Sequence, residues 1–179
     1  MSSDPFAVLS LEPMFDLDMS ALQRAYLDAQ QTTHPDRLPS TATPAERLKA
    51  MQHSMALNDA YQTLRSPLAR AQALLAAQGI RVGGERDTHK PSTPLLMEVM
   101  EWREALAGAD LPAIGFQITE LQEVAKHTER QLAFQLGNDE WDEATQTTLR
   151  LQYLDKTLQD AKAKRRQLAA RAPTSPSGQ

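Results

Sequence analysis

Apolar residues recur at spacings of three and four along most of the chain, which is the period of an amphipathic helix. Runs of alternating β-branched residues, which would indicate strands, are missing. Proline, glycine and capping residues separate the periodic segments. We therefore expect an all-α protein, with helices over about 4–9, 18–33, 44–65, 67–79, 93–108, 110–137 and 139–170.

Several helix ends carry specific signals. Thr43-Pro44-Ala45-Glu46 is a capping box with proline at the first helical position, and Gly79 fits a left-handed helix end. The helix over 44–65 is expected to bury a face of Leu48, Met51, Met55, Asn58, Tyr61 and Leu64. The helix after Asp110 is expected to bury Leu111, Ile114, Ile118, Leu121, Ala125, Thr128, Leu132 and Leu136.

Residues 79–92 contain three glycines, one proline and several charges, which is typical of a domain boundary. We expect an antiparallel helix pair within 1–78, a linker at 79–92 and a three-helix bundle at 93–171. The tail at 172–179 is rich in proline, serine and glycine and is expected to be disordered.

Composition excludes several classes of protein. The 179 residues have 41% hydrophobic positions, a net charge of −4 and no cysteine. Disulfide frameworks, thiolate nucleophiles and cysteine-ligated metals are therefore excluded. No basic region followed by an apolar run is found at the N-terminus, and no apolar stretch approaches the roughly 20 residues of a membrane span. We expect a cytoplasmic protein that lies in no membrane.

The tripeptide His34-Pro35-Asp36 lies between two long predicted helices. By chance it would occur in about one chain in a hundred of this length, so alone it is a modest signal. Its position strengthens it, because proline fixes the bend and leaves an imidazole and a carboxylate exposed on a loop. Such residues suit docking onto another protein.

A second candidate surface lies in the helix over 93–108. Leu96, Met97 and Met100 form an apolar strip, and Glu98, Glu101 and Glu104 recur every three residues beside it. Methionine is an adaptable contact residue. The pattern fits either packing within the bundle or a surface for a partner.

The whole arrangement resembles the HscB family of J-domain co-chaperones of iron–sulfur cluster assembly. A short helix, a long helix, His-Pro-Asp and another long helix resemble a J domain. Residues 57–71 resemble the second half of that domain in this family, and residues 95–106 resemble its client-binding helix. Residues 138–141 and 154–156 match the last helix, so the resemblance covers about 4–170.

The resemblance implies two partners and no enzymatic activity of the chain itself. A DnaK-family ATPase chaperone (HscA-like) would be bound and stimulated, and an iron–sulfur scaffold of IscU type would be the client. The docking residues implied or lying nearby are His34, Pro35, Asp36, Arg37, Arg24, Arg47, Lys49 and Arg65. The client residues implied are Leu96, Met97, Met100, Glu101 and Glu104, with Tyr153 as a neighbour.

The sequence departs from most J domains in one respect. Arg24 is the only basic residue in the helix before the tripeptide, so docking is expected to depend more on Arg37, Arg47, Lys49 and Arg65. No phosphate-binding loop or metal-ligand spacing is found, and we expect no cofactor and no metal. The basic run Lys162, Lys164, Arg165 and Arg166 is interpreted as favourable charge at a helix C-terminus rather than as a nucleic-acid site.

Three alternatives stay open. The bundle could serve a J protein with a different client. The chain could be a helical metal-dependent hydrolase that uses His34, Asp36 and the glutamates. It could also be a helical scaffold in which the stripe over 111–136 is an oligomer seam, although we expect mostly monomer.

Overall fold

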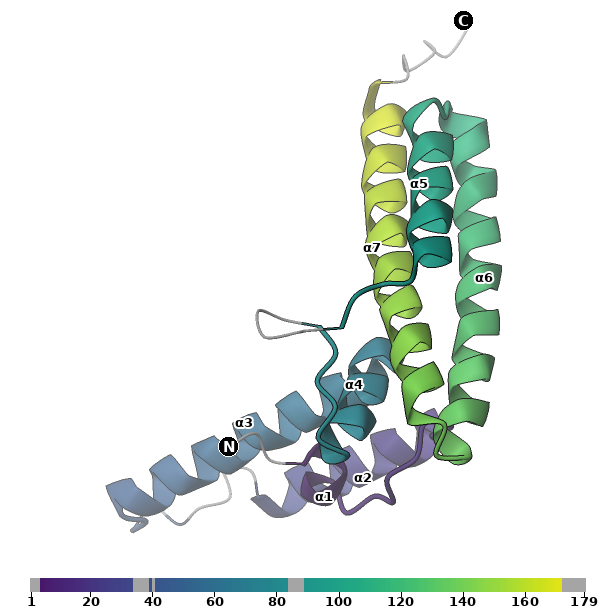
Figure 1. The fold of residues 1–179 in the computed structure, drawn as a ribbon. Coiled ribbons are helices and arrows are strands. Elements are labelled where there is room, and N and C mark those ends of the chain that lie inside the picture. The colour runs from purple at the N-terminus through teal and green to yellow at the C-terminus, as the bar shows by residue number, and fades with distance from the viewer. Residues whose placement is uncertain (1–3, 34–38, 40, 84–88, 172–179) are drawn as a thin grey trace, which may run out of the picture.

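The computed structural model describes residues 4–33, 39, 41–83 and 89–171. Within these ranges the chain forms helices and no strand, so the predicted all-α class is confirmed. Figure 1 shows an upright bundle of α5, α6 and α7, with α2 and α3 lying across its lower end. α4 lies between the α2–α3 pair and the bundle. The helices are α1 (Pro5–Val8), α2 (Met19–Thr33), α3 (Pro44–Arg65), α4 (Pro67–Ala77), α5 (Thr93–Ala107), α6 (Leu111–Gly137) and α7 (Trp141–Arg171).

The helix ends follow the predicted caps. The Thr43 hydroxyl accepts a hydrogen bond from the Glu46 backbone N–H at 3.3 Å, and the Thr43 backbone N–H donates to the Glu46 carboxylate at 2.7 Å. The Thr43 backbone N–H and the Thr43 hydroxyl both donate to the Glu46 carboxylate, and these bonds lower the pKa of Glu46 because they favour its charged form. After α4, Gly79 adopts the predicted left-handed conformation, with φ +81°.

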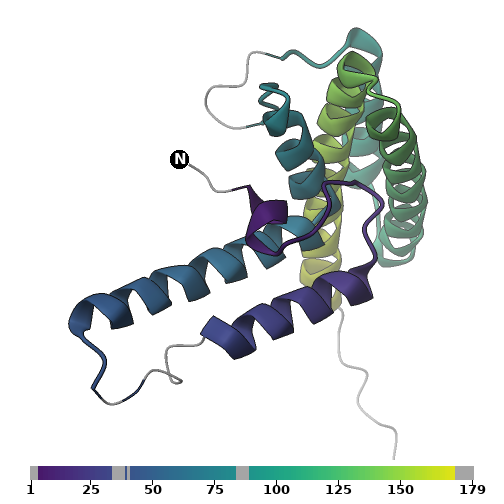
Figure 2. The same cartoon turned by 90° about the horizontal axis from the view of Figure 1, so that it is seen from below.

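The N-terminal helices enclose their own core. α2 and α3 lie side by side and α1 packs against α3, as Figure 2 shows from below. Tyr26 of α2 stacks on Tyr61 of α3 with ring centroids 4.4 Å apart. The buried members of this core are Phe6, Leu9, Leu22, Leu57, Ala60 and Leu64.

The predicted buried face of α3 is wrong for four of its six positions. Leu48, Met51, Met55 and Asn58 are exposed, whereas Leu57 and Ala60 are buried. Spacings of three and four fit several overlapping faces of one helix, and only the packing partner selects among them. Leu111, at the start of the stripe predicted for α6, is also exposed, while the later positions of that stripe are buried or partly buried.

α6 and α7 form the longest helix pair of the bundle. Leucine, isoleucine and alanine side chains fill their interface, together with several buried threonines. Thr145, Thr148 and Thr157 each donate their hydroxyl to the carbonyl four residues earlier, at 2.7–2.8 Å. Their polar groups are therefore satisfied inside α7, and the threonine methyls can face an apolar interior.

α4 joins the two parts through a shared core. Ala71 and Leu75 of α4 are fully buried in one cluster with Val99 of α5 and Leu132 of α6. Val82 belongs to the same cluster, so part of the segment predicted as a linker packs against the bundle. The division into domains at 1–78 and 93–171 remains a prediction about independent folding.

Arg70 is a buried cation at this junction, and the sequence patterns did not single it out. Its guanidinium donates to the Leu64 carbonyl at 2.8 Å and to the Phe15 carbonyl at 2.5 Å, and it lies 5.4 Å from the centre of the Phe15 ring. Burial lowers the pKa of Arg70, and the nearby Glu129 and Asp16 carboxylates oppose that shift. Arg70 therefore ties the segment before α2 to the C-terminal end of α3.

We expect Arg70→Ala to lower the free energy of unfolding by about 2–4 kcal/mol, because it removes buried charged hydrogen bonds and the packing of the side-chain stem. Urea denaturation measures this change. The matched control is Arg24→Ala, whose exposed partner Asp18 lies 3.8 Å away, just before α2 begins. The control should change stability by less than about 1 kcal/mol. Equal effects of the two substitutions would contradict the role given to Arg70.

Candidate functional site

The first candidate surface is the end of the α2–α3 hairpin. His34, Pro35, Asp36 and Arg37 lie outside the described residues. The helices that flank them end and begin as predicted, at Thr33 and Pro44. Figure 2 shows that both helix ends lie on the side away from the bundle, and that the start of α3 projects beyond the end of α2. The described part of the hairpin thus leaves this end clear of α5–α7.

The structure separates the basic residues expected at that surface. Arg47 and Lys49 lie in the first turns of α3, where both are exposed, and Arg24 is exposed on α2. Arg65 lies 16 residues after Lys49 on the same helix, so the two are roughly 24 Å apart along the axis. Arg65 instead lines a groove at the junction, together with Arg70 and Glu129. Burial raises the pKa of Glu129 in this groove.

The second candidate surface is the outer face of α5. Leu96, Met97 and Met100 are 43%, 60% and 69% exposed. Of the two interpretations left open by the sequence, packing inside the bundle is therefore wrong for these three side chains. Glu101 and Glu104 are exposed beside them.

The remaining client residue predicted, Tyr153 of α7, is only partly buried. It packs against the core shared by α4 and the bundle. It lies on a different helix from the exposed strip.

α5 begins where the sequence predicts, and Ser92 is its cap. The Ser92 hydroxyl accepts a hydrogen bond from the Leu95 backbone N–H at 3.4 Å. The inward face then presents Leu95, Val99 and Leu106 to the core, and the partly buried Trp102 packs against it in the same row. One narrow apolar row thus attaches α5 to the other two helices of the bundle.

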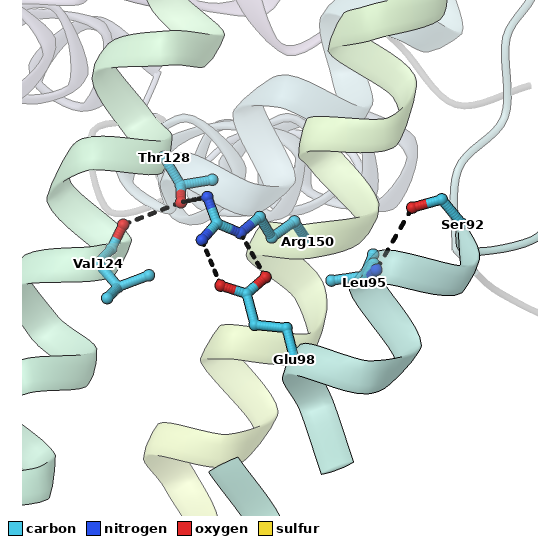
Figure 3. Close-up of polar contacts among 6 residues, drawn as sticks. All are labelled: Ser92, Leu95, Glu98, Val124, Thr128 and Arg150. Carbon is cyan, nitrogen blue, oxygen red and sulfur yellow. Dashed lines mark hydrogen bonds and ion pairs between the residues drawn. The ribbon is translucent and has the colours of Figure 1, made fainter. Parts of the chain in front are cut away.

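Glu98 does not belong to the exposed acidic strip. Its carboxylate forms a two-pronged ion pair with Arg150 of α7, at 2.9 Å to Nε and 2.5 Å to Nη2, as Figure 3 shows. Arg150 also donates to the hydroxyl of Thr128 on α6, at 3.4 Å. A spacing of three turns a helix by about 300°, so Glu98 and Glu104 lie about 120° apart around α5. The sequence could place the three glutamates near one another but could not show which of them was paired.

Side chains of α6 and α7 hold the C-terminal end of α5 by donating hydrogen bonds to its carbonyl groups. Lys164 of α7 donates to the carbonyls of Leu106 and Ala107, and Gln117 of α6 donates to that of Ala105 at 2.8 Å. A cation at a helix C-terminus interacts favourably with the helix dipole. Lys164 therefore has the kind of role expected from the basic run, although the helix end that it contacts is that of α5 rather than of α7.

Two further searches concern only the described residues. Among residues 4–33, 39, 41–83 and 89–171, no group of three or more histidine, aspartate or glutamate side chains could hold a metal ion. None of the helices in this part of the chain is both long and apolar enough to cross a membrane.

Comparisons with known proteins agree with this architecture. A family model described as the HSCB C-terminal oligomerisation domain matches residues 92–162. The co-chaperone protein HscB homolog of Paraburkholderia phymatum is 35% identical over 160 residues, which cover 87% of this chain and 90% of that protein. The match therefore includes both the hairpin and the bundle.

Solved structures give the same result. Chaperone HscB from Vibrio cholerae superposes with a TM-score of 0.78 at 34% identity, covering 92% of this chain and 98% of that one. The human co-chaperone protein HscB superposes with a TM-score of 0.83 at 27% identity, covering 91% and 82%. These matches confirm the resemblance found in the sequence, with a J domain followed by a C-terminal helical domain. The chain therefore belongs to the HscB family of co-chaperones.

Proposed function

We propose that this chain docks on an HscA/DnaK-family ATPase chaperone, stimulates its ATP hydrolysis and delivers to it an iron–sulfur scaffold protein of IscU type. The observation that carries the proposal is the exposed strip of Leu96, Met97 and Met100 on α5. It lies within the region matched by the C-terminal family model. A J-domain protein that exposes such a strip at a distance from its hairpin has separate surfaces for two partners.

The chemistry of the strip indicates what its client offers. Exposed leucine and methionine side chains gain free energy when another apolar surface covers them. Glu101 and Glu104 add negative charge at the edge, which favours a client with basic groups around an apolar patch. Tyr153 on α7 can extend the contact beyond α5.

The hairpin end is the surface proposed for the ATPase chaperone. His34, Pro35 and Asp36 would make the contact, and Arg37 follows them in sequence. Arg24, Arg47 and Lys49 can add positive charge there, whereas Arg65 would add its charge at the other end of α3, in the groove beside Arg70 and Glu129. Docking with so few cations should depend only modestly on salt.

The proposed mechanism requires no chemistry from this chain. Holding the client and the ATPase chaperone together raises the effective concentration of one for the other. Docking favours the hydrolysis-competent state of the chaperone, whose own groups cleave ATP. The chain is thus proposed to be a cytoplasmic co-chaperone without a cofactor, and neither nucleic acid nor a membrane is among its proposed partners.

The decisive experiment is single-turnover ATP hydrolysis by an HscA-like chaperone, with this chain alone, with scaffold alone and with both. We expect a rate with both that exceeds the product of the separate effects. His34→Gln should abolish stimulation while leaving the fold and scaffold binding intact, because it changes only the docking tripeptide.

His127→Gln, an identical substitution at an exposed position of α6, is the matched control and should behave like the parent. Stimulation that survives in His34→Gln would contradict the docking role of the tripeptide. Stimulation by the parent without any effect of scaffold would instead indicate a J protein with another client.

The double variant Met97→Ala with Met100→Ala should weaken scaffold binding by about tenfold or more, since it removes much of the exposed apolar strip. Stimulation of the ATPase in the absence of scaffold should be unchanged. Isothermal titration calorimetry measures the affinity.

The chain supplies a matched control for that variant. Met51 and Met55 on α3 are 55% and 61% exposed, close to the values for Met97 and Met100. Met51→Ala with Met55→Ala should leave scaffold affinity unchanged. Equal affinities of the parent and the α5 variant would refute the proposed client surface.

We also expect the free chain to be mostly monomeric. The most exposed large apolar side chains of α6 are Phe116, in its second turn, and Phe134, in its last turn. They are 18 positions apart, which is roughly 27 Å along the helix. Charged residues such as Glu120 and Glu123 lie between them, so they form no continuous apolar patch. Light scattering should give a mass near 19.9 kDa. A dimer mass at micromolar concentration would contradict this expectation and would favour an oligomer seam on α6.

A further inference from the structure

The rotation of α5 about its own axis determines whether its apolar strip is exposed. The inward row of α5 covers only about 60° around the helix axis and consists of Leu95, Val99, Trp102 and Leu106. A helix that rests on one such row can roll over it. At 100° per residue, Glu98 lies about 70° to one side of the middle of this row, and Leu96 lies about 90° to the other. A roll that turns Leu96 inward therefore turns Glu98 outward.

Two free-energy terms favour that roll. Leu96 and Met100 are apolar and exposed, so turning them toward the core would remove apolar surface from water. Glu98 is a carboxylate with 30% of its side chain exposed, so turning it outward would restore its hydration. The packing of the inward row opposes the roll, because the roll would expose these apolar side chains to water. A contact that holds the Glu98 side of α5 would reinforce this packing.

The ion pair with Arg150 is placed to do so. Its two hydrogen bonds hold Glu98 on the side of α5 that would have to move outward. Arg150 is itself held by α7 and by its contact with Thr128, a fully buried residue of α6 whose hydroxyl donates to the Val124 carbonyl at 2.9 Å. Figure 3 shows this chain of contacts across the three helices.

The other polar contacts of α5 act at its end. Lys164 and Gln117 hold carbonyls at the C-terminal turn, which lies two to three turns beyond Glu98. The Ser92 cap acts within α5 and its own N-terminus. The Glu98–Arg150 pair is therefore the polar contact that controls rotation where Leu96, Met97 and Met100 lie.

We propose that Arg150 is a positioning residue for client binding: by holding Glu98, it prevents α5 from rolling its apolar strip into the bundle. The importance of this strip for a client rests on the proposed function. The control of α5 rotation by Arg150 is independent of the proposed function and can be measured on the chain alone.

Thiol labelling tests the rotation directly, because the chain contains no cysteine of its own. Leu96→Cys and Met97→Cys are made separately in the parent and in the Arg150→Met background, and the rate of maleimide labelling is measured. Met97 points almost opposite the buried row and stays exposed after a roll of several tens of degrees. We expect Arg150→Met to slow labelling at position 96 by at least about threefold and to leave position 97 unchanged, since the rate follows thiol exposure.

Comparing the labelling rates at positions 96 and 97 distinguishes a rotation of α5 from a general loosening of its packing. A purely structural role of Arg150 would free α5 and speed labelling at both positions, which would overturn the proposal. Equal rates in the two backgrounds would overturn it as well. Arg150→Lys keeps a positive charge near Glu98 and should keep labelling at position 96 close to the parent rate, whereas a rate like that of Arg150→Met would argue that charge does not hold the helix.

Scaffold titration completes the test. Arg150→Met should weaken scaffold binding, with partial recovery in Arg150→Lys, and should leave stimulation of the ATPase without scaffold unchanged. Unchanged scaffold affinity in Arg150→Met, alongside a loss in the Met97 and Met100 double variant, would overturn the positioning role in binding. If the parent chain binds no scaffold, the proposed function fails, while the labelling rates still decide whether Arg150 controls the rotation of α5.

Discussion

The apolar core that α4 shares with α6 and α7 is the contact on which the placement of both candidate surfaces depends. Ala71 and Leu75 are fully buried in it, and Val82 adds to it after α4 ends. Because α4 also continues from α3 through a single turn, this core sets the direction of the hairpin relative to the bundle. The two proposed partners would therefore meet this chain at surfaces whose separation is set by packed side chains rather than by a tether.

Local signals along the chain predicted where helices begin and end. The capping box at Thr43 and the left-handed Gly79 each involve groups within a few residues of one another. Such contacts depend on sequence alone, and the structure confirms them. The all-α class followed from the same signals combined with helical periodicity.

Contacts between distant residues were not predictable in the same way. The buried face of α3 depends on where α1 and α2 pack against it. The spacing of apolar residues within α3 does not encode that position. Glu98 looked equivalent to Glu101 and Glu104 until Arg150, 52 residues away, was found to pair with it. Arg70 gave no signal because an arginine in a helix is usually exposed, and only the converging carbonyls of Phe15 and Leu64 explain its burial. The resemblance to a family named the partners but left the orientation of α5 open.

The exposed methionines of α5 have a further chemical consequence. Oxidation converts a methionine thioether into a polar sulfoxide, and exposed thioethers are attacked before buried ones. In a chain without cysteine, Met97 and Met100 are among the sulfur atoms most open to an oxidant. The same exposure that makes this strip adaptable to a partner thus makes its apolar character sensitive to the redox state of the surroundings.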